Sequence, residues 1–100
     1  MAQVTQDPHL LARIDRYLDY LTSEWESVPL LAEEWDQWDE HSQFSFAMDW
    51  PIREDRLREL RNWVERDVLT SAQRARYEAL VDLVACHRPI LAKLLDDNRQ

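Results

Sequence analysis

The chain contains no glycine in 100 residues, where average usage would supply about seven. Glycine is the residue that adopts positive φ at low cost and lets the backbone approach a ligand closely. Phosphate-binding loops, dinucleotide-binding turns and tight β-hairpins depend on it. The sequence therefore predicts a fold without such loops and argues against nucleotide chemistry built on them.

Apolar residues recur at three- and four-residue steps along most of the chain, the spacing that places them on one face of an α-helix. Capping residues mark two helix starts. Asp7 and Pro8 suit the first turn of a helix, and Thr70 with Gln73 forms a capping box. The pattern predicts four helices, over residues 8–27, 29–40, 51–68 and 71–96.

Residues 41–50 depart from this pattern. Phe44, Phe46 and Met48 alternate at period two, as they would in a strand, yet no second strand-like segment is present to pair with them. An isolated strand is not stable. We therefore predict a packed, non-helical segment here, whose aromatic side chains enter the core.

Pro89 lies within the last predicted helix, on the side opposite the apolar stripe. The stripe keeps one phase across it, and a proline on the solvent side bends a helix without placing its ring in the core. We predict one helix kinked at Pro89, with a break at residue 88 as the alternative. The predicted fold class is all-α: a single domain, residues 1–100, forming a small antiparallel bundle of about four helices.

Acidic residues are concentrated in the first half of the chain. Residues 1–50 carry eleven acids and two arginines, a net charge of −9, whereas residues 51–100 carry nine acids and ten bases, a net charge of +1. The overall charge of −8 argues against direct binding to nucleic acid or to an anionic membrane, which needs clustered Lys and Arg. It favours a basic protein partner. The residues predicted to bind that partner lie on the outer faces of the first two helices: Asp15, Asp19, Glu26, Glu33, Asp36 and Glu40.

Three of the five tryptophans lie in the segment Glu24–Glu40, which holds seven acids and no base. Helical phase places Trp35 and Trp38 on the same face as Leu31, which favours a position in the core. A surface hot spot of tryptophans ringed by carboxylates is the alternative. A third interpretation is a pocket for a small apolar ligand between the helices. Its predicted lining residues are Trp25, Trp35, Trp38, Phe44, Phe46, Trp50 and Trp63.

Five arginines between residues 53 and 66 resemble a basic patch on the third predicted helix. However, Glu54 lies four residues before Arg58, and Glu65 lies four residues after Arg61, a spacing that neutralises much of the charge within the helix. Arginines of this helix can also pair with acids of the second helix if the two are antiparallel neighbours. We predict an internally paired or solvated face here rather than a phosphate site.

The sequence shows no catalytic or metal-binding constellation. Neither Glu-x-x-His nor His-Glu-x-x-His occurs, and the single cysteine, Cys86, has no second cysteine to bind a metal with. Cys86 and His87 are adjacent, so on a helix they point about 100° apart and do not form a dyad. We predict no enzyme activity, no metal and no cofactor. The lone thiol, the polar start of the chain and the lack of a long apolar run indicate a cytoplasmic protein without a membrane span.

The last predicted helix has an unusually wide apolar face, as a central or self-associating helix would. A homo-oligomer is therefore predicted, and its face comprises Leu83, His87, Ile90 and Leu94. His87 also suits a hydrogen-bonded position in the core. The leading functional prediction is a small acidic protein-interaction module: an adaptor, a regulatory subunit, or an inhibitor or antitoxin of a basic partner. The alternatives are a bundle that binds a small apolar ligand and a purely structural homo-oligomer.

Overall fold

The backbone of residues 7–98 is helical over nearly its whole length in the computed structural model, which describes these residues and the side chains of residues 7–96. The elements, in order, are α1 (Pro8–Glu26), α2 (Val28–Glu34), the 3-10 turn η1 (Trp35–Gln37), α3 (Glu40–Glu65) and α4 (Ser71–Asn98). Within this range no strand occurs, so the predicted all-α class is confirmed. Predictions about the polar start, Met1 to Gln6, lie outside the described residues.

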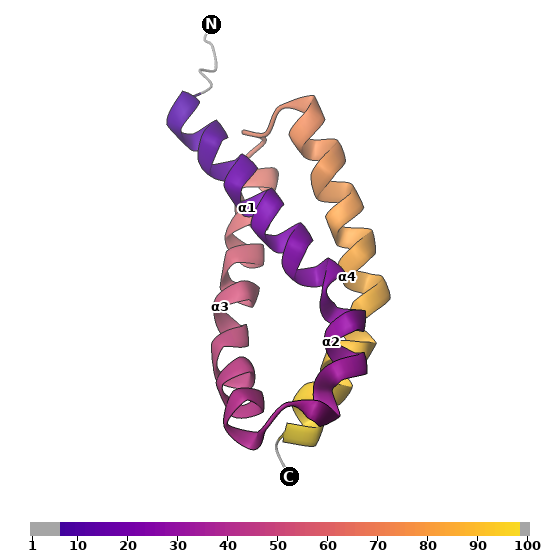
Figure 1. Ribbon diagram of the computed structural model, residues 1–100. Helices are drawn as coiled ribbons and strands as arrows, with labels where there is room; N and C mark the ends of the chain where they lie inside the picture. The colour runs from indigo at the N-terminus through magenta and orange to yellow at the C-terminus, as the bar shows by residue number, and fades with distance from the viewer. Residues whose placement is uncertain (1–6, 99–100) are drawn as a thin grey trace, which may run out of the picture.

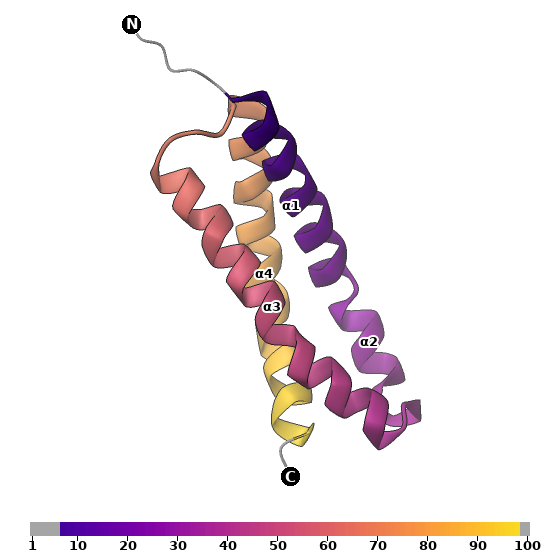
Figure 2. The same ribbon diagram turned by 90° about the vertical axis from the view of Figure 1, so that its left-hand side faces the viewer.

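Three long arms build an elongated bundle with principal extents of 55 × 21 × 17 Å. The first arm is bent and consists of α1 followed by α2; α3 returns along it, and α4 then runs parallel to α1 (Figures 1 and 2). The predicted count of four side-by-side helices is therefore slightly wrong. Ser27, between α1 and α2, keeps right-handed helical angles (φ −79°, ψ −11°), so the chain bends there without reversing.

Residues 41–50, predicted to be non-helical, form the first part of α3. Asp39 caps the start of this helix: its carboxylate accepts a hydrogen bond from the Ser42 amide at 2.6 Å, and this bond lowers the pKa of Asp39. The sequence predicts that a helix starts at Pro51, but this residue lies inside α3 with its ring exposed. The alternation of aromatic residues was misleading, because Phe46 faces the core whereas Phe44 faces solvent.

Local signals placed the other helix starts correctly. The Asp7 carboxylate accepts from the His9 amide at 2.9 Å, and Pro8 is the first residue of α1. At the start of α4, Thr70 and Gln73 form the reciprocal capping box, both bonds 3.1 Å long. Pro89 is exposed and lies within α4, which continues through it, so the alternative break at residue 88 is not observed.

The end of α3 shows how the chain manages without glycine. Amides of Asp67 and Val68 bond back to carbonyls of the last turn of α3, at 3.0 and 3.3 Å, in the pattern of a Schellman motif. This motif needs one residue in the left-handed region of backbone conformation, and Asp67 occupies that region with φ 61°. Aspartate is one of the few non-glycine residues that tolerate this region. Arg74 stabilises the arrangement by donating to Asp67 at 3.0 Å.

The core lies along the axis where the three arms meet. The buried face of α1 recurs every three or four residues and consists of Ile14, Leu18, Leu21 and Trp25, all at most 1% exposed. It packs on Leu60 and Trp63 of α3 and on buried aliphatic residues of α4. The outward side of α3 and the space between α3 and α4 are not covered by the first arm. An apolar surface and a groove described below lie there.

Candidate functional site

All six acids predicted to bind a partner are exposed, but they do not form one uniform face. Asp15 and Asp19 of α1 both pair with Arg76 of α4, which neutralises part of their charge. Within residues 7–96, no ion pair involves the other four: Glu26, Glu33, Asp36 and Glu40. The unbalanced negative charge is therefore found towards the end of the molecule where α2 leads into α3.

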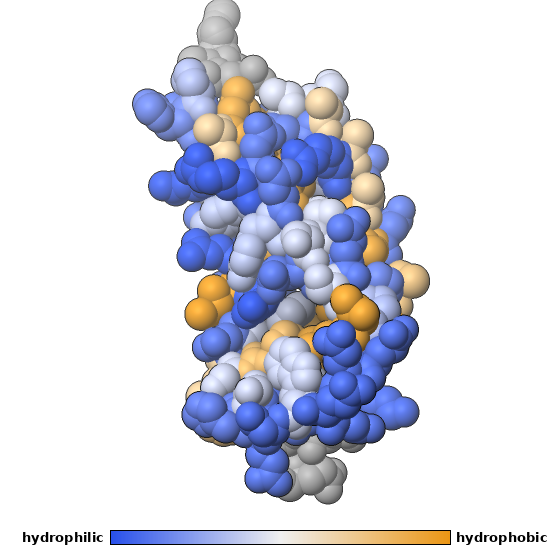
Figure 3. Space-filling view, in the orientation of Figure 1, coloured by the Kyte–Doolittle hydropathy of each residue, from blue (hydrophilic) through white to orange (hydrophobic). Residues whose placement is uncertain are grey.

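This acidic end has no basic residue nearby in sequence, because the chain contains no Lys or Arg between Arg16 and Arg53. Glu33, Glu34 and Asp36 lie exposed on α2 and η1, and Asp39 and Glu40 lie exposed at the start of α3. Hydrophilic residues cover this end of the molecule in Figure 3. A negative potential here attracts a positively charged partner.

Three large apolar side chains lie exposed beside this acidic end. Phe44, Met48 and Ile52 of α3 are 55%, 62% and 51% exposed, and their spacing of four residues puts them on one face of the helix. We call these three residues the outer stripe. Glu40 continues the same spacing one turn earlier, and Asp49 lies exposed within the same turns. A contiguous apolar patch with a polar rim is typical of an interaction site.

The sequence pattern does not predict the outer stripe, because residues 41–50 are expected to be non-helical with their aromatic side chains, Phe44 among them, in the core. The signal was present: a spacing of four from Phe44 through Ile52, preceded by the capping residue Asp39. It was hidden because the inward series, Phe46 and Trp50, interleaves with it at the same spacing. Two helical faces that are both apolar cannot be told apart from a strand by alternation alone.

The aromatic residues predicted to line a ligand pocket are mostly packed together. Trp25, Trp35, Trp50 and Trp63 are buried, and Trp38 and Phe46 are half-buried. Ring contacts with centroids 5.2 to 6.2 Å apart join Trp35, Trp38, Phe46, Trp50 and Trp25 into one aromatic cluster. The remaining two lie apart from it: Trp63 packs on Tyr17, and Phe44 belongs to the outer stripe.

A shallow hollow of about 230 Å³ lies between α2 and α3, over one side of the aromatic cluster. Trp38, Phe46 and Trp50 form its apolar wall, with Leu30 and Glu34 on the α2 side. Glu24 also borders the hollow, but it is bound to Arg53 at 2.6 Å. The hollow brings together three of the seven predicted pocket residues.

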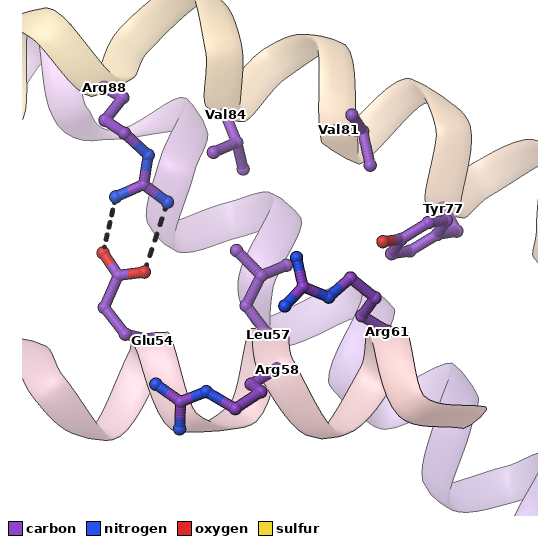
Figure 4. Close-up of a pocket in the computed structure, with 8 residues that line it drawn as sticks. All are labelled: Glu54, Leu57, Arg58, Arg61, Tyr77, Val81, Val84 and Arg88. Carbon is purple, nitrogen blue, oxygen red and sulfur yellow. Dashed lines mark hydrogen bonds and ion pairs between the residues drawn. The ribbon is translucent and has the colours of Figure 1, made fainter. Parts of the chain in front are cut away.

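A second groove separates α3 from α4 (Figure 4). Its volume is about 320 Å³, and three arginines line it: Arg58, Arg61 and Arg88. Glu54 closes one end through two hydrogen bonds to Arg88, at 2.9 and 3.2 Å. The predicted pairing of Glu54 with Arg58 is therefore not observed, because Arg58 pairs with Asp55 instead.

The Glu54–Arg88 pair makes part of the protein's stability dependent on the ionisation of Glu54. Burial alone would raise the pKa of Glu54, but hydrogen bonds from Arg88 and from Trp50 Nε1 outweigh it and hold the pKa below its ordinary value. A lowered folded pKa contributes stability above the ordinary glutamate pKa of about 4.3. That contribution is lost as the pH falls through the folded pKa.

We therefore expect Glu54→Gln to lower the free energy of unfolding by about 1–2 kcal/mol at pH 7, the range for a partly exposed hydrogen-bonded charge pair. The difference from wild type should vanish as both proteins are acidified towards pH 3. Urea titrations at pH 7, 5, 4 and 3 measure it. Asp55→Asn, which breaks only the exposed pair with Arg58, is the matched control; an equal pH dependence in both variants would contradict the assignment to Glu54.

The residues predicted to form an oligomer face turn mainly inwards. Leu94 is buried, and Leu83 and Ile90 are half-buried against the core. His87 Nδ1 lies 2.9 Å from the carbonyl oxygen of Trp25, which ties α4 to the end of α1. Much of this stripe is therefore used within the chain, since α1 and α2 pack against it.

Comparison with known protein families, curated proteins and solved structures finds no match to this chain. Within the described residues, no three His, Cys, Asp or Glu side chains gather as metal ligands would. Cys86 is exposed and lies beside the inward-facing His87. Among residues 7–98, none of the helices combines the length and the apolar character that crossing a bilayer requires.

Proposed function

We propose that this protein is a non-enzymatic, cytoplasmic protein-interaction module that docks onto a basic partner through the outer stripe of α3 and the acidic end next to it. Such a module acts as an adaptor, a regulatory subunit or an inhibitor. One observation carries the proposal: Phe44, Met48 and Ile52 are each more than half exposed on one helical face, in a segment, residues 17–52, that contains no Lys or Arg. The partner surface that fits is an apolar groove bordered by Lys and Arg.

The energetics of such a contact are favourable. Fully burying a Phe, Met or Ile side chain contributes about 1.5–3 kcal/mol each, and helical anchors four residues apart are a common way to dock into a groove. The surrounding carboxylates accelerate encounter with a basic partner. They also disfavour a second copy on this face, because Glu40 and Asp49 would meet their own equivalents or other acids of the same end.

The test begins with affinity isolation from a lysate of the source organism at low salt, followed by titration of the recovered partner with purified variants. The triple variant Phe44→Ser/Met48→Ser/Ile52→Ser should bind at least 100-fold more weakly, since about 2 kcal/mol per hot-spot residue is typical. Because the three side chains are exposed, the fold should be retained. Raising the salt from 0.1 to 0.5 M should weaken wild-type binding, because exposed charges are screened.

Tyr20→Ser is the control, because Tyr20 is an exposed aromatic residue on another helix, α1, and does not belong to the outer stripe. It should bind like wild type. Circular dichroism and urea titration verify that the triple variant remains folded. A folded triple variant with wild-type affinity would refute the docking surface, and so would failure of the wild-type protein to retain any basic partner at low salt.

A bundle that binds a small apolar ligand is the second candidate, and the hollow between α2 and α3 favours it. Trp38, Phe46 and Trp50 line that hollow, so a bound ligand should change tryptophan fluorescence at any salt concentration. The hollow has a volume of about 230 Å³, which is below the usual range of drug-sized sites, about 300–1,000 Å³. For that reason the outer stripe is the better-supported site. A structural homo-oligomer remains the third prediction.

A further inference from the structure

The groove between α3 and α4 is an open space bordered by side chains of both helices. Leu57, Val81 and Val84 form its apolar floor, and polar groups stand around it. Figure 4 shows the Arg61 guanidinium reaching across Leu57 into this space and the Tyr77 hydroxyl pointing into it from α4. The volume of about 320 Å³ falls within the range of small-molecule sites.

The charge of the groove is opposite to that of the molecule. The eight lining residues include three arginines and one carboxylate, whereas the whole chain has a net charge of −8. The carboxylate of Glu54 is already bound in a bidentate manner by Arg88, and Arg58 is paired with Asp55 at 2.7 Å. Arg61 has no ion pair or hydrogen bond within residues 7–96, so its planar donor group remains open to a ligand.

Tyr77 adds a neutral donor next to this guanidinium. Burial raises the pKa of Tyr77, and Glu65 adds to the effect, while the nearby charge of Arg61 opposes it; the net shift is upward. The phenol therefore keeps its proton at neutral pH. Within the described residues the hydroxyl makes no hydrogen bond, so it can donate to an acceptor held by Arg61.

From this arrangement we infer that the α3–α4 groove binds a small organic carboxylate with an apolar body. The carboxylate accepts from Arg61 and from the Tyr77 hydroxyl, and the hydrocarbon part lies on Leu57, Val81 and Val84. Arginine presents two parallel N–H donors that match a carboxylate, and the apolar floor takes a chain or ring but offers no partner to a second charge. This site shares no residue with the outer stripe, so it stands independently of the proposed protein interaction.

The test uses octanoate as the probe and its neutral amide, octanamide, as the matched ligand. Two-dimensional ¹H–¹⁵N NMR titrations of the full chain follow the backbone amides. Octanoate should shift amides of residues 54–61 and 77–88 and should bind at least tenfold more tightly than octanamide. Arg61→Gln should weaken octanoate binding at least tenfold, and Tyr77→Phe should weaken it about threefold to tenfold, as loss of one hydrogen bond does.

Arg66→Gln provides the control, since it removes the same charge from the exposed end of α3 without touching the groove. It should bind octanoate within twofold of wild type. Equal binding of octanoate and octanamide would overturn the inference, as would unchanged affinity of Arg61→Gln or shifts confined to the α2–α3 hollow. Phenyl phosphate and phenylacetate are further probes that compare a phosphate with a carboxylate on a similar apolar body. Tighter binding of phenyl phosphate than of phenylacetate and octanoate would overturn the carboxylate assignment.

Discussion

Replacing Trp25 with alanine is expected to lower the free energy of unfolding by about 3–5 kcal/mol, the usual cost of truncating a buried aromatic residue. Trp25 is 1% exposed and lies at the bend of the first arm. Its ring packs edge-on against Trp50 at 5.2 Å, and the Arg88 guanidinium lies over it at 5.0 Å. One side chain thus contacts both other arms of the bundle.

Such a loss is large for a domain of this size, whose total stability is about 5–15 kcal/mol. Urea titration followed by far-ultraviolet circular dichroism measures it, and Trp25→Phe, which keeps an aromatic ring, covers the case in which the alanine variant does not fold. Trp38→Ala is the control: Trp38 is half-buried at the far end of the aromatic cluster, so about 1–2 kcal/mol is expected. Equal losses at the two positions would show that the cluster does not stabilise the bend as described.

Helix existence and most helix starts could be predicted, because their causes are local. A cap such as Asp7, or the box of Thr70 and Gln73, needs only residues two or three positions away. The inward face of α1 likewise follows from spacing alone. Each of these features depends on residues that are close together in the chain, so the sequence alone is enough to predict them.

The course of the chain at its prolines could not be predicted in the same way. Proline inside a helix costs about 3 kcal/mol or more by local rules, so the sequence predicts that a helix starts at Pro51. In the folded protein that cost is offset by tertiary contacts: Phe46 packs on Trp35 and Trp38, and Trp50, one turn later, packs on Trp25. These partners belong to other parts of the chain, so the local pattern around Pro51 does not reveal them.

Ion pairing shows the same limit. The i,i+4 rule predicts Glu54 with Arg58, a pair that contributes about 0.2–0.5 kcal/mol. The fold instead offers Glu54 a bidentate partner from another helix, Arg88, and this half-buried geometry prevails over the local one. Within residues 7–96 Arg61 forms no ion pair with Glu65 either, so its guanidinium lies unpaired beside the groove. Arg76, which binds both Asp15 and Asp19, reduces the predicted acidic face by the same mechanism.

Gln73 connects the start of α4 to α1, and Gln73→Ala is expected to lower the free energy of unfolding by about 2–3 kcal/mol. It is the one buried polar side chain among the described residues, 5% exposed. Its Nε2 donates to the Leu11 carbonyl at 3.0 Å and to Asp15 at 2.9 Å. Its Oε1 accepts from the Thr70 amide. The substitution removes half of the capping box and both bonds to α1.

Gln73→Glu separates these two roles, because glutamate serves a capping box as well as glutamine does but cannot donate when ionised. At pH 7 its carboxylate would face the Leu11 carbonyl and the Asp15 carboxylate, so we expect a loss at least as large as that of Gln73→Ala.

Burial and the Asp15 charge raise the pKa of the introduced acid in the folded state. The folded protein then binds a proton more tightly than the unfolded one, so the loss should shrink as the pH falls through the raised folded pKa towards the ordinary glutamate value of about 4.3. Urea titrations between pH 7 and 4 test this, with Gln37→Glu on the exposed surface of η1 as the control, expected within about 0.5 kcal/mol of wild type. A Gln73→Glu variant as stable as wild type at pH 7 would mean that the cap alone matters and that the bonds to α1 contribute nothing measurable.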